Sequence, residues 1–432
     1  MEIIINPNRS EWNTISQRTL MDTSQLDSIC KEVFNSISKL KDHAIRHYTL
    51  QFDKVNIDNI EISKEEITEA AKAIRDALKN AINLAKDNIW KFHKSQELVP
   101  NIITTTQGVE CWQESRAIEK VGIYIPGGTA PLFSTVLMLA IPAKIAGCKE
   151  IILCSPPDSD GKIADEILYA AHITGVDRVF RIGGIQAIAA MTLGTESIPQ
   201  VNKLFGPGNQ YVTAAKQYAT RLGMAIDLPA GPSEVLIMAD ETSDTSFLAA
   251  DLLSQAEHGK DSQVILISTS QTLLNAVNQI VYKQLEDLPR KDIAGQSIQK
   301  SKLICLPDKQ NCIDFINEYA PEHLILSVKD VEFFTSRLIN AGSVFLGHFT
   351  PESAGDYASG TNHTLPTNGY AKAYSGVNLD SFIKKITFQK ITEQGLLNIG
   401  PAIELMAEAE GLHAHKNAVS IRLKKITNKD KR

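Results

Sequence analysis

Hydrophobic residues in the first part of the chain recur at helical spacing. Seven apolar residues lie three or four positions apart: Ile67, Ala70, Ala71, Ile74, Leu78, Ile82 and Ala85. This spacing predicts one amphipathic helix that continues towards Trp90. Residues 1 to about 110 are otherwise rich in charge and helical pattern, and we expect them to act as scaffold.

A different pattern begins near residue 121, where short apolar segments alternate with helical ones. The predicted strands of this series are Val121–Ile125, Glu150–Cys154, Arg178–Ile182 and Lys203–Phe205. Its predicted helices are Phe133–Ala146, Ala164–Thr174, Gln186–Leu193 and Gln210–Leu222. Such alternation predicts a mainly parallel sheet with crossover helices.

A second series of the same kind follows. Its predicted strands are Glu234–Ala239, Gln263–Ser268, Lys302–Leu306, Leu324–Val328 and Ser343–Leu346. Its predicted helices are Phe247–Glu257, Leu273–Leu285, Gln310–Tyr319 and Val331–Ile339. Two such series predict an α/β protein with two adjacent open sheets and a cleft between them. After about residue 380 the pattern is helical again, at Leu396–Leu412, and Ala418–Leu423 fits a short strand.

The composition is that of an ordinary globular protein. Of the 432 residues, 43% are hydrophobic and 22% are charged, and the formal net charge is -6. This negative balance argues against a nucleic-acid partner. Basic residues cluster at Arg422–Lys425 and Lys429–Arg432, where they are typical of a solvated tail.

Cysteine usage and hydropathy indicate a cytoplasmic protein. The six cysteines are Cys30, Cys111, Cys148, Cys154, Cys305 and Cys312. They form no CxxC pair, and in a chain of this length they are typical of reduced thiols. The apolar run Val136–Ile145 is interrupted by Pro142 and Lys144, so no segment reaches the ~18 apolar residues of a membrane span.

Glycine-rich turns follow three of the predicted strands. The turns are Pro126–Thr129, Ile182–Gly184 and Phe205–Asn209. Glycine lets the backbone approach a phosphate, and open α/β sheets bind ligands at the carboxyl ends of their strands. The P-loop lysine and the G-x-G-x-x-G fingerprint are both absent, and each turn alone is typical of a structural turn. Together, with Tyr124, Gln186 and Asn209 beside them, they predict a nucleotide site of unusual form.

Three polar islands interrupt the apolar pattern. They are Ser254–Gly259, Pro321–Leu324 and Glu352–His363. In the first island, Gln255 and His258 are three positions apart and share a helix face, with His258 at the helix end before Gly259. A histidine there is often a C-terminal cap, but an oxygen donor one turn back suits a metal site.

The second island places Glu322 beside His323 in a turn before a strand. Neighbours in an extended chain point to opposite sides, and histidine titrates near neutrality, as general acid–base catalysis requires. The third island is a polar loop at a strand end, a usual place for catalytic residues, with Asp356 and His363 as donors. For each island the alternative is a solvated loop with no role in ligand binding or catalysis.

Further donors lie near the C-terminus, where Glu410, His413 and His415 add a carboxylate and two imidazoles. Histidine, aspartate and amide donors without cysteine favour a catalytic site for zinc or a similar divalent ion over a structural one. The donors are scattered along the sequence, so their spacing alone does not define a ligand set.

Six motifs, in order along the chain, resemble those of the histidinol dehydrogenase family. They are Tyr124-Ile-Pro-Gly-Gly, Phe205-Gly-Pro-Gly-Asn, Pro229-Ala-Gly-Pro-Ser-Glu, Leu252-Leu-Ser-Gln-Ala-Glu-His-Gly, Pro321-Glu-His-Leu and Pro351-Glu-Ser-Ala-Gly-Asp-Tyr-Ala-Ser-Gly-Thr-Asn-His. The resemblance extends from about residue 110 to residue 420. It implies an NAD-dependent, zinc-containing enzyme of histidine biosynthesis that oxidises L-histidinol through L-histidinal to L-histidine, with two NAD⁺ per product.

The resemblance also implies a role for each matching residue. The metal ligands fall on Gln255, His258, Asp356 and His415, with one zinc ion per subunit. The catalytic pair falls on Glu322 and His323. Substrate contacts fall on Ser233, His363 and Glu410, together with His323 and the four metal ligands. The NAD contacts fall on Tyr124, Gln186 and Asn209.

The fold that the resemblance implies has two Rossmann-like open parallel-sheet domains with smaller helical N- and C-terminal segments. Residues 1–24 are expected to form an N-terminal extension, and residues 25–118 with 236–376 the domain that carries the metal and catalytic residues. Residues 119–235 are expected to carry the NAD contacts, and residues 377–432 to close the partner subunit's site. The family forms homodimers, so Glu410 and His415 are expected to act across the interface.

These roles lead to a hypothesis for the mechanism, which we weigh against two alternative functions of the protein. The metal would hold the substrate, His323 would take the hydroxyl proton as hydride leaves, and Glu322 would activate water to attack the aldehyde. A zinc-dependent hydrolase of an amide or ester would use the same metal and Glu–His pair, but it has no role for the glycine turns. The second alternative is a non-catalytic scaffold protein, which would need neither the Glu322–His323 pair nor the metal-type donors His258, Asp356 and His415.

Overall fold

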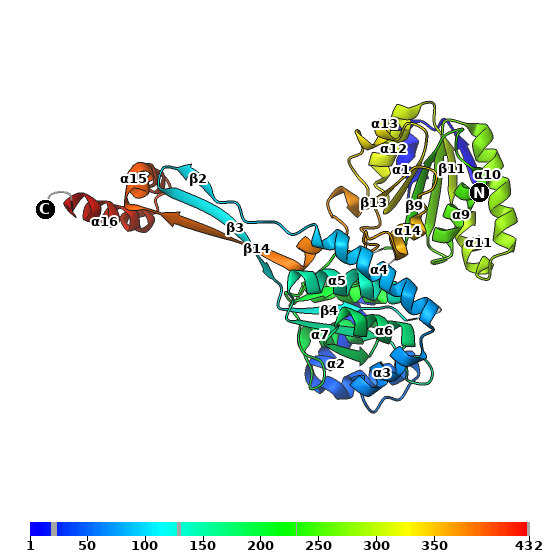
Figure 1. Cartoon of the computed structure of the whole chain (residues 1–432), viewed down its shortest axis with the longest axis horizontal. Helices are drawn as coiled ribbons and strands as arrows, with labels where there is room; N and C mark the ends of the chain where they lie inside the picture. Colours follow the sequence, from blue (N-terminus) through cyan, green and yellow to red (C-terminus); the bar gives the residue numbers. More distant parts are fainter. Residues whose placement is uncertain (19–23, 128–130, 230, 430–432) are drawn as a thin grey trace. The chain divides into compact units, whose positions relative to one another are not determined.

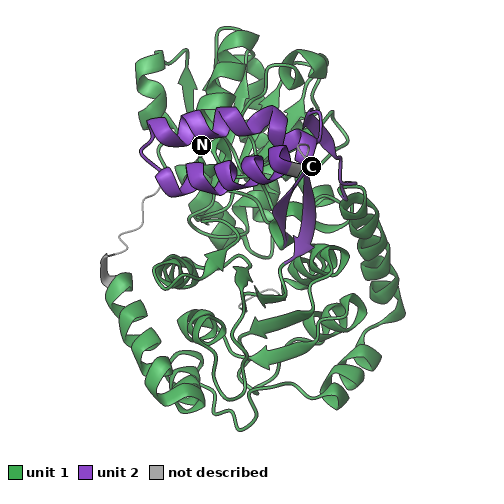
Figure 2. Ribbon diagram, turned by 90° about the vertical axis from the view of Figure 1, so that its left-hand side faces the viewer, with its two compact units in different colours: residues 1–96, 118–382 green, residues 97–117, 383–432 purple. Residues whose placement is uncertain are grey.

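The chain folds into two units. The structure, a computed structural model, describes residues 1–18, 24–127, 131–229 and 231–429. One unit comprises residues 1–96 and 118–382, and the other residues 97–117 and 383–432 (Figures 1 and 2). The larger unit contains two parallel sheets, as the alternating pattern predicted, and the smaller unit contains an antiparallel sheet. In the described part of the chain, no helix is long and apolar enough to cross a membrane.

The first parallel sheet has six strands and is covered on both faces. Its strands, in spatial order, are β1 (Glu2–Ile5), β11 (Lys302–Cys305), β10 (Gln263–Ser268), β9 (Glu234–Ala239), β12 (His323–Ser327) and β13 (Ser343–Leu346). One face is covered by α9 (Thr245–Ala256), α10 (Gln271–Glu286) and α11 (Lys291–Lys300). The other is covered by α1 (Trp12–Ile15), α12 (Lys309–Tyr319) and α13 (Val331–Thr335). Burial on both faces explains the continuous apolar runs of these strands.

The second parallel sheet has five strands. In spatial order they are β6 (Arg178–Arg181), β5 (Glu150–Ser155), β4 (Lys120–Tyr124), β7 (Lys203–Phe205) and β8 (Ala225–Ile226). One face packs against α2 (Ser24–Tyr48), α7 (Gly184–Leu193) and α8 (Gln210–Thr220). The other packs against α3 (Lys64–Ala73), α4 (Asp76–Lys94), α5 (Phe133–Ala146) and α6 (Asp165–Thr174).

The helical N-terminal part differs from the expectation at one point. The single helix predicted through residues 67–85 is two helices, α3 and α4, because Ile74 and Arg75 between them are extended. Helices α2, α3 and α4 bury their apolar faces in the cores of the five-stranded sheet, and Asn88 of α4 also donates to the Ala358 carbonyl at 2.9 Å. The predicted domain boundaries stay a prediction. Helical periodicity shows that a face is buried, but it does not show which sheet buries it.

The smaller unit is built from residues far apart in the sequence. Strand β3 (Val109–Ala117) pairs antiparallel with both β2 (Ile103–Thr106) and β14 (Ile383–Ile391). Helices α15 (Glu393–Ala409) and α16 (His413–Lys429) pack against each other, and Gly400 leaves room for Leu423. Two expectations are therefore wrong. Residues 383–391 are a strand, and Ala418–Leu423 lies within α16, where packing on α15 overrides the local alternation.

Short helices complete the chain. They are η1 (Arg9–Glu11), η2 (Thr49–Asp53), α14 (Glu352–Tyr357), η3 (Tyr370–Lys372) and η4 (Leu379–Phe382). Two of them, η2 and α14, contribute side chains to the sites described below.

A buried ion pair holds the glycine turn after β7. Lys216 Nζ lies 2.5 Å from Asp227 Oδ1, and both side chains are almost fully buried. Lys216 also donates to the carbonyl of Gly206, and Asp227 accepts the Gly206 N–H, both at 2.8 Å. The pair therefore clamps both sides of Gly206, which has φ +125° and would bring any Cβ into the Tyr124 carbonyl.

Replacing Lys216 with Met is expected to lower the free energy of unfolding by ~3–5 kcal/mol, because Asp227 stays buried without its counter-charge. Urea unfolding followed by circular dichroism measures the change. The matched control is Arg221→Met. It removes the exposed pair with Asp27, at 2.7 Å, and should cost less than ~1 kcal/mol. Equal losses in the two variants would contradict the structural role of Lys216.

Candidate active site

A cavity of about 830 Å³ opens at the carboxyl ends of the five-stranded sheet. The three residues predicted to contact NAD all line it: Tyr124 ends β4, Gln186 lies in α7, and Asn209 caps α8. The Tyr124 hydroxyl accepts the Gly184 N–H at 3.2 Å. The structure thus brings these three residues together where an open α/β sheet binds its ligand.

The glycines beside this cavity are required by the packing of the backbone. A Cβ on Gly127 or Gly183 would collide with Pro156, and one on Gly206 with the Tyr124 carbonyl. Each of the three glycine turns therefore has a structural reason for its glycine, which is the alternative that the sequence analysis left open. Pro156, Gly127 and Tyr124 all line the cavity, so the same close packing shapes its wall.

Gln186 meets a carboxylate that the sequence did not single out. Its side chain is fully buried, and Nε2 donates to Asp53 Oδ2 at 3.2 Å. Burial raises the pKa of Asp53 to about 6. Gln186 Oε1 has no hydrogen-bond partner among the described residues. A buried acceptor without a partner is costly, so it suits a cavity that receives a donor from a ligand.

The predicted catalytic pair lies at the amino ends of the six-stranded sheet. His323 begins β12, and Glu234 begins the neighbouring strand β9. Glu322 Oε2 accepts the Glu234 N–H at 2.8 Å, and His323 Nδ1 lies 3.0 Å from the Glu234 carbonyl oxygen. The backbone of a single residue, Glu234, therefore contacts both Glu322 and His323.

The Glu234 carbonyl decides the tautomer of neutral His323. A carbonyl can only accept, so the 3.0 Å contact requires a hydrogen on Nδ1. Gln255 Nε2 also lies 3.2 Å from Nδ1, but an amide can turn its oxygen towards an N–H. Nε2 then carries the lone pair, and it has no hydrogen-bond partner among the described residues.

Carboxylates surround His323. Its Nδ1 lies 3.6 Å from Glu352 Oε1 and 3.7 Å from Glu322 Oε2, and its Nε2 lies 3.6 Å from Asp356 Oδ1. Burial by itself lowers the pKa of His323, but Glu352, Glu322 and Asp356 hold it well above its usual value. Burial raises the pKa of Glu322 to about 8, against the opposing charge of His323. Both groups are thus buried acid–base residues with strongly perturbed pKa values, as is common at active sites.

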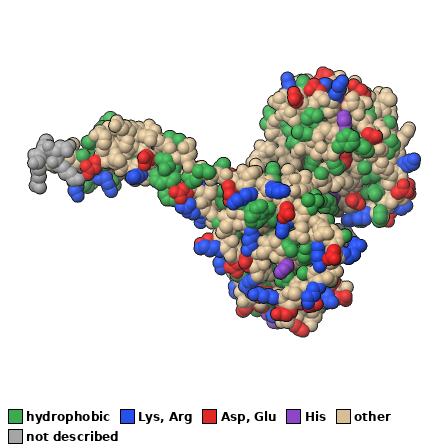
Figure 3. Space-filling view, viewed as in Figure 1, with side chains coloured by type: hydrophobic (Ala, Val, Ile, Leu, Met, Phe, Trp, Pro, Cys, Tyr) green, Lys and Arg blue, Asp and Glu red, His purple; other side chains and the backbone are tan. Residues whose placement is uncertain are grey.

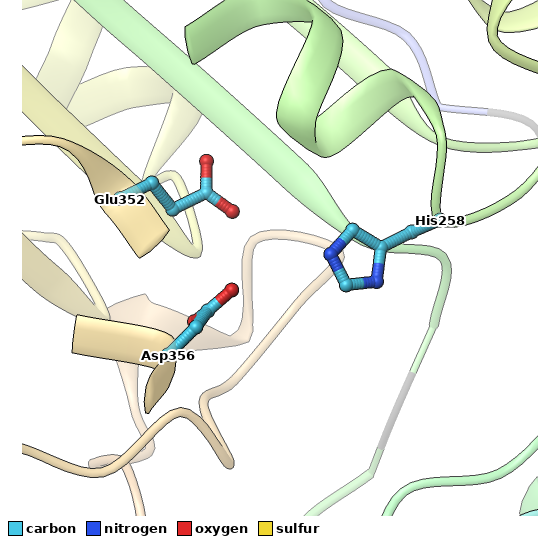
Figure 4. Close-up of side chains that lie close together, drawn as sticks. All are labelled: His258, Glu352 and Asp356. Atoms are coloured by element: carbon cyan, nitrogen blue, oxygen red, sulfur yellow. The ribbon is translucent and has the colours of Figure 1, made fainter. Parts of the chain in front are cut away.

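A group of donors suited to a metal lies beside this histidine. One donor atom each from His258, Glu352 and Asp356 lies within 4.8 Å of the others, and Figure 4 shows both carboxylates directed towards the imidazole. His258 lies in the turn after α9, which ends at Ala256, two residues before His258. The set of nitrogen and carboxylate donors fits a zinc-type ion.

Glu352 is the residue of this group that the sequence analysis missed as a ligand candidate. Its side chain is 1% exposed, and Oε2 has no hydrogen-bond partner among the described residues. Burial raises the pKa of Glu352 well above its usual value. Glu352 and Asp356 are four residues apart in α14, so the i,i+4 spacing on one helix face could have identified it.

Of the other residues predicted to bind metal or substrate, three lie in the larger unit and two in the smaller unit. Gln255 is buried in the last turn of α9, and Ser233 directly precedes β9. His363 lies 2.9 Å through Nδ1 from the Asp356 carbonyl and 3.0 Å through Nε2 from Thr135 Oγ1 on α5, so it bridges the two sheets. Glu410 and His415 belong to the smaller unit, where both are exposed, and their predicted place at the site stays a prediction.

A cavity at the carboxyl ends of one parallel sheet and a buried histidine among carboxylates at the other are typical of an α/β enzyme with acid–base chemistry. The family model described as histidinol dehydrogenase matches residues 16–423. A histidinol dehydrogenase of Bacteroides fragilis is 57% identical over 99% of this chain and 100% of its own length. One described as chloroplastic, from Arabidopsis thaliana, is 48% identical over 97% and 90%.

A solved structure agrees with these relatives. The crystal structure of histidinol dehydrogenase from Elizabethkingia anophelis superposes with a TM-score of 0.97 at 58% identity, and the match covers 99% of both chains. The chain belongs to the histidinol dehydrogenase family. The resemblance inferred from the six motifs is confirmed, and with it an oxidoreductase of the last steps of histidine biosynthesis, so the hydrolase alternative is not favoured.

Proposed function

We propose that this chain oxidises L-histidinol through L-histidinal to L-histidine at the site formed by the cavity and the His323 cluster. The observation that carries the proposal is buried His323, whose Nε2 has no hydrogen-bond partner among the described residues, beside a group of metal-type donors. His363 supports a single site, because it connects Asp356, beside His323, to Thr135 on the helix that follows the Tyr124 strand.

The decisive experiment is the yield of NADH per histidinol, read by ultraviolet absorbance with histidinol limiting. A yield of two supports the complete four-electron oxidation. A yield of one would mean that the reaction stops at the aldehyde, and no histidinol-dependent NADH would reject the proposal.

NAD fits the cavity at the five-stranded sheet. The proposed contacts are Tyr124, Gln186 and Asn209, and the orphaned Gln186 Oε1 can accept a hydrogen bond from the dinucleotide. NAD⁺ supplies the hydride acceptor in each of the two oxidations. Asp53, within hydrogen-bonding distance of Gln186, orients the amide so that Oε1 remains available.

Replacing Gln186 with Leu is expected to raise the KM for NAD ~10-fold or more, since losing a hydrogen bond to a buried group costs about 1–3 kcal/mol. The KM for histidinol should stay the same. Gln284→Leu is the control, because it removes a similar amide bond, to the Ser246 carbonyl at 3.0 Å, away from the cavity. An unchanged KM for NAD in Gln186→Leu would place the dinucleotide elsewhere.

A zinc ion, one per subunit, fits the donor group. We propose Gln255, His258 and Asp356 as its ligands, with the partner subunit's His415 as the fourth. Zinc would supply a charged template for the imidazole and amine of the substrate. Ser233, His363 and the partner subunit's Glu410 are the further proposed substrate contacts.

Proton transfers fall to the catalytic pair. His323 Nε2 takes the hydroxyl proton as hydride leaves the carbinol carbon, which yields the aldehyde. Glu322 then takes a proton from the water that attacks the aldehyde, and its buried carboxylate, with a pKa raised to about 8, is basic enough to do so. The resulting hydrate passes a hydride to the second NAD⁺ and its hydroxyl proton to His323, after His323 has released the first proton to solvent. This step yields the carboxylic acid.

We also propose a homodimer in which the smaller unit completes the partner's site. The smaller unit carries apolar side chains at its surface, among them Leu98 and Val99 at 67% and 90% exposure, and Figure 3 shows hydrophobic side chains there. They line a hollow of about 680 Å³ that includes Trp112 and Phe388. Exposed apolar surface of this kind is typical of an interface. The cytoplasmic location expected from the sequence stays a prediction.

Complementation between subunits tests the shared site. His323→Asn and His415→Ala are each expected to abolish most activity in homodimers. Co-expressed subunits, one carrying each change, should regain about a quarter of the wild-type activity, because half of the random dimers are mixed and each mixed dimer keeps one intact site. Chromatography with light scattering verifies the dimer. Failure of the mixture to regain activity would place His415 in its own subunit's site.

A further inference from the structure

Glu234, whose main chain contacts both catalytic residues, is itself held by the N-terminal segment. Arg18 Nε lies 2.5 Å from Glu234 Oε1, and Arg18 Nη2 lies 2.8 Å from Oε2. Two parallel bonds between a guanidinium and a carboxylate are stronger and more directional than a single charged contact. The Glu234 side chain is 2% exposed, so solvent does little to weaken this pair.

Arg18 and Glu234 each have a second anchor. Arg18 Nη2 also donates to the Tyr319 carbonyl at 2.8 Å, and its guanidinium carbon lies 4.0 Å from the centroid of the Tyr319 ring. The Asn368 N–H donates to Glu234 Oε1 at 2.7 Å. The carboxylate therefore accepts three hydrogen bonds, two from Arg18 and one from Asn368, which leaves it little freedom to turn.

The position of Glu234 at the start of its strand places its backbone against the catalytic pair. It is the first residue of β9, and the peptide before it is held by β10, where the Gln263 N–H donates to the Ser233 carbonyl at 3.1 Å. Its N–H holds Glu322 Oε2, and its carbonyl sets the tautomer of His323. Catalytic groups must be held to within ~0.5 Å by residues whose own conformations are locked. The ion pair with Arg18 fixes the side chain of Glu234 and thereby restrains its backbone N–H and carbonyl.

We infer that Arg18 is a positioning residue for the oxidation, acting through Glu234 on Glu322 and His323. The inference rests on the proposed catalytic roles of that pair. Among the described residues, the hydrogen bonds of Arg18 go to Glu234 and Tyr319, and not to residues that line the NAD cavity or belong to the donor group. Its loss should therefore disturb proton transfer and leave the binding of substrate, NAD and metal intact.

The test begins with Arg18→Met in the full-length enzyme. A misplacement of about 1 Å costs on the order of 10² in rate, so kcat is expected to fall ~10²-fold. The KM values for histidinol and NAD and the bound zinc should stay near those of the wild type. Arg9→Met is the matched control, because Arg9 lies in the same segment and is exposed, 3.4 Å from Asp314, and its loss should leave kcat unchanged.

A double-mutant cycle separates positioning from a general structural role. If Arg18 acts through His323, adding Arg18→Met to His323→Asn should lower the residual rate by much less than ~10²-fold, because coupled residues are not additive. The same ~10²-fold loss in both backgrounds would overturn the inference, as would an unchanged kcat in Arg18→Met or a loss of zinc.

Arg18→Met leaves the buried Glu234 charged and without its counter-ion, so this variant could fail to fold. A second variant keeps the inference testable in that case. Arg18→Met combined with Glu234→Gln is neutral and keeps an acceptor for the Asn368 N–H, and the same fall in kcat is expected. A wild-type enzyme without histidinol-dependent NADH would instead count against the proposed function, which distinguishes the two failures.

Discussion

His323→Asn is expected to lower kcat for both oxidations by ~10²–10⁴-fold, the usual cost of losing a general base. Asparagine keeps a donor for the Glu234 carbonyl through its amide, so the local backbone contact survives. What it lacks is the titratable ring nitrogen Nε2, which lies 3.6 Å from Asp356 Oδ1. The loss should appear mainly in kcat, because the change removes the proton acceptor of both steps. Stopped-flow NADH formation, started from histidinol and separately from histidinal, measures each step.

Glu322→Gln is the matched variant for this prediction. Glutamine can still accept the Glu234 N–H, so the pair's geometry is kept while the basic oxygen is lost. The oxidation of histidinol to the aldehyde should remain close to wild type, and the oxidation of histidinal should fall. Equal damage to both steps would contradict the division of labour between Glu322 and His323.

Asp356→Asn is expected to lower the affinity for zinc by at least ~100-fold, since even residues that only orient a ligand contribute about 10–100-fold. Activity should fall with the metal and return in part when zinc is added in excess. Asparagine keeps the size of the side chain but removes the charge that faces His258 and His323. Elemental analysis after dialysis gives the bound metal. Asp53→Asn, which changes a carboxylate in the NAD cavity, should keep its zinc.

Glu352→Gln decides between two ligand sets in the same assay. Glu352 lies in the donor group with His258 and Asp356, but the family resemblance assigns the place to Gln255. We expect Glu352→Gln to keep its zinc and Gln255→Ala to lose it. The opposite result would put Glu352 in the ligand set and leave Gln255 as a partner of His323.

The alternation of strands and helices was predictable because each element buries a regular pattern of side chains. Predicted strands such as Gln263–Ser268 and Lys203–Phe205 agree with β10 and β7 residue for residue, and Phe133–Ala146 agrees with α5. The alternating strand and helix patterns reflect contacts within and next to each element, so a local window contains the information. One error arose where the pairing partner is distant, because β14 pairs with a strand more than 260 residues earlier.

The sequence by itself determined the α/β class, the two parallel sheets, the family and the residue types of the site, because long motifs in a fixed order are specific. Only the tertiary structure decided which groups meet. Glu352 joins His258 through the orientation of α14, and Asp53 reaches Gln186 across 133 positions. Arg18 reaches Glu234 across 216 positions. No local periodicity encodes such contacts, because they depend on how separate elements pack.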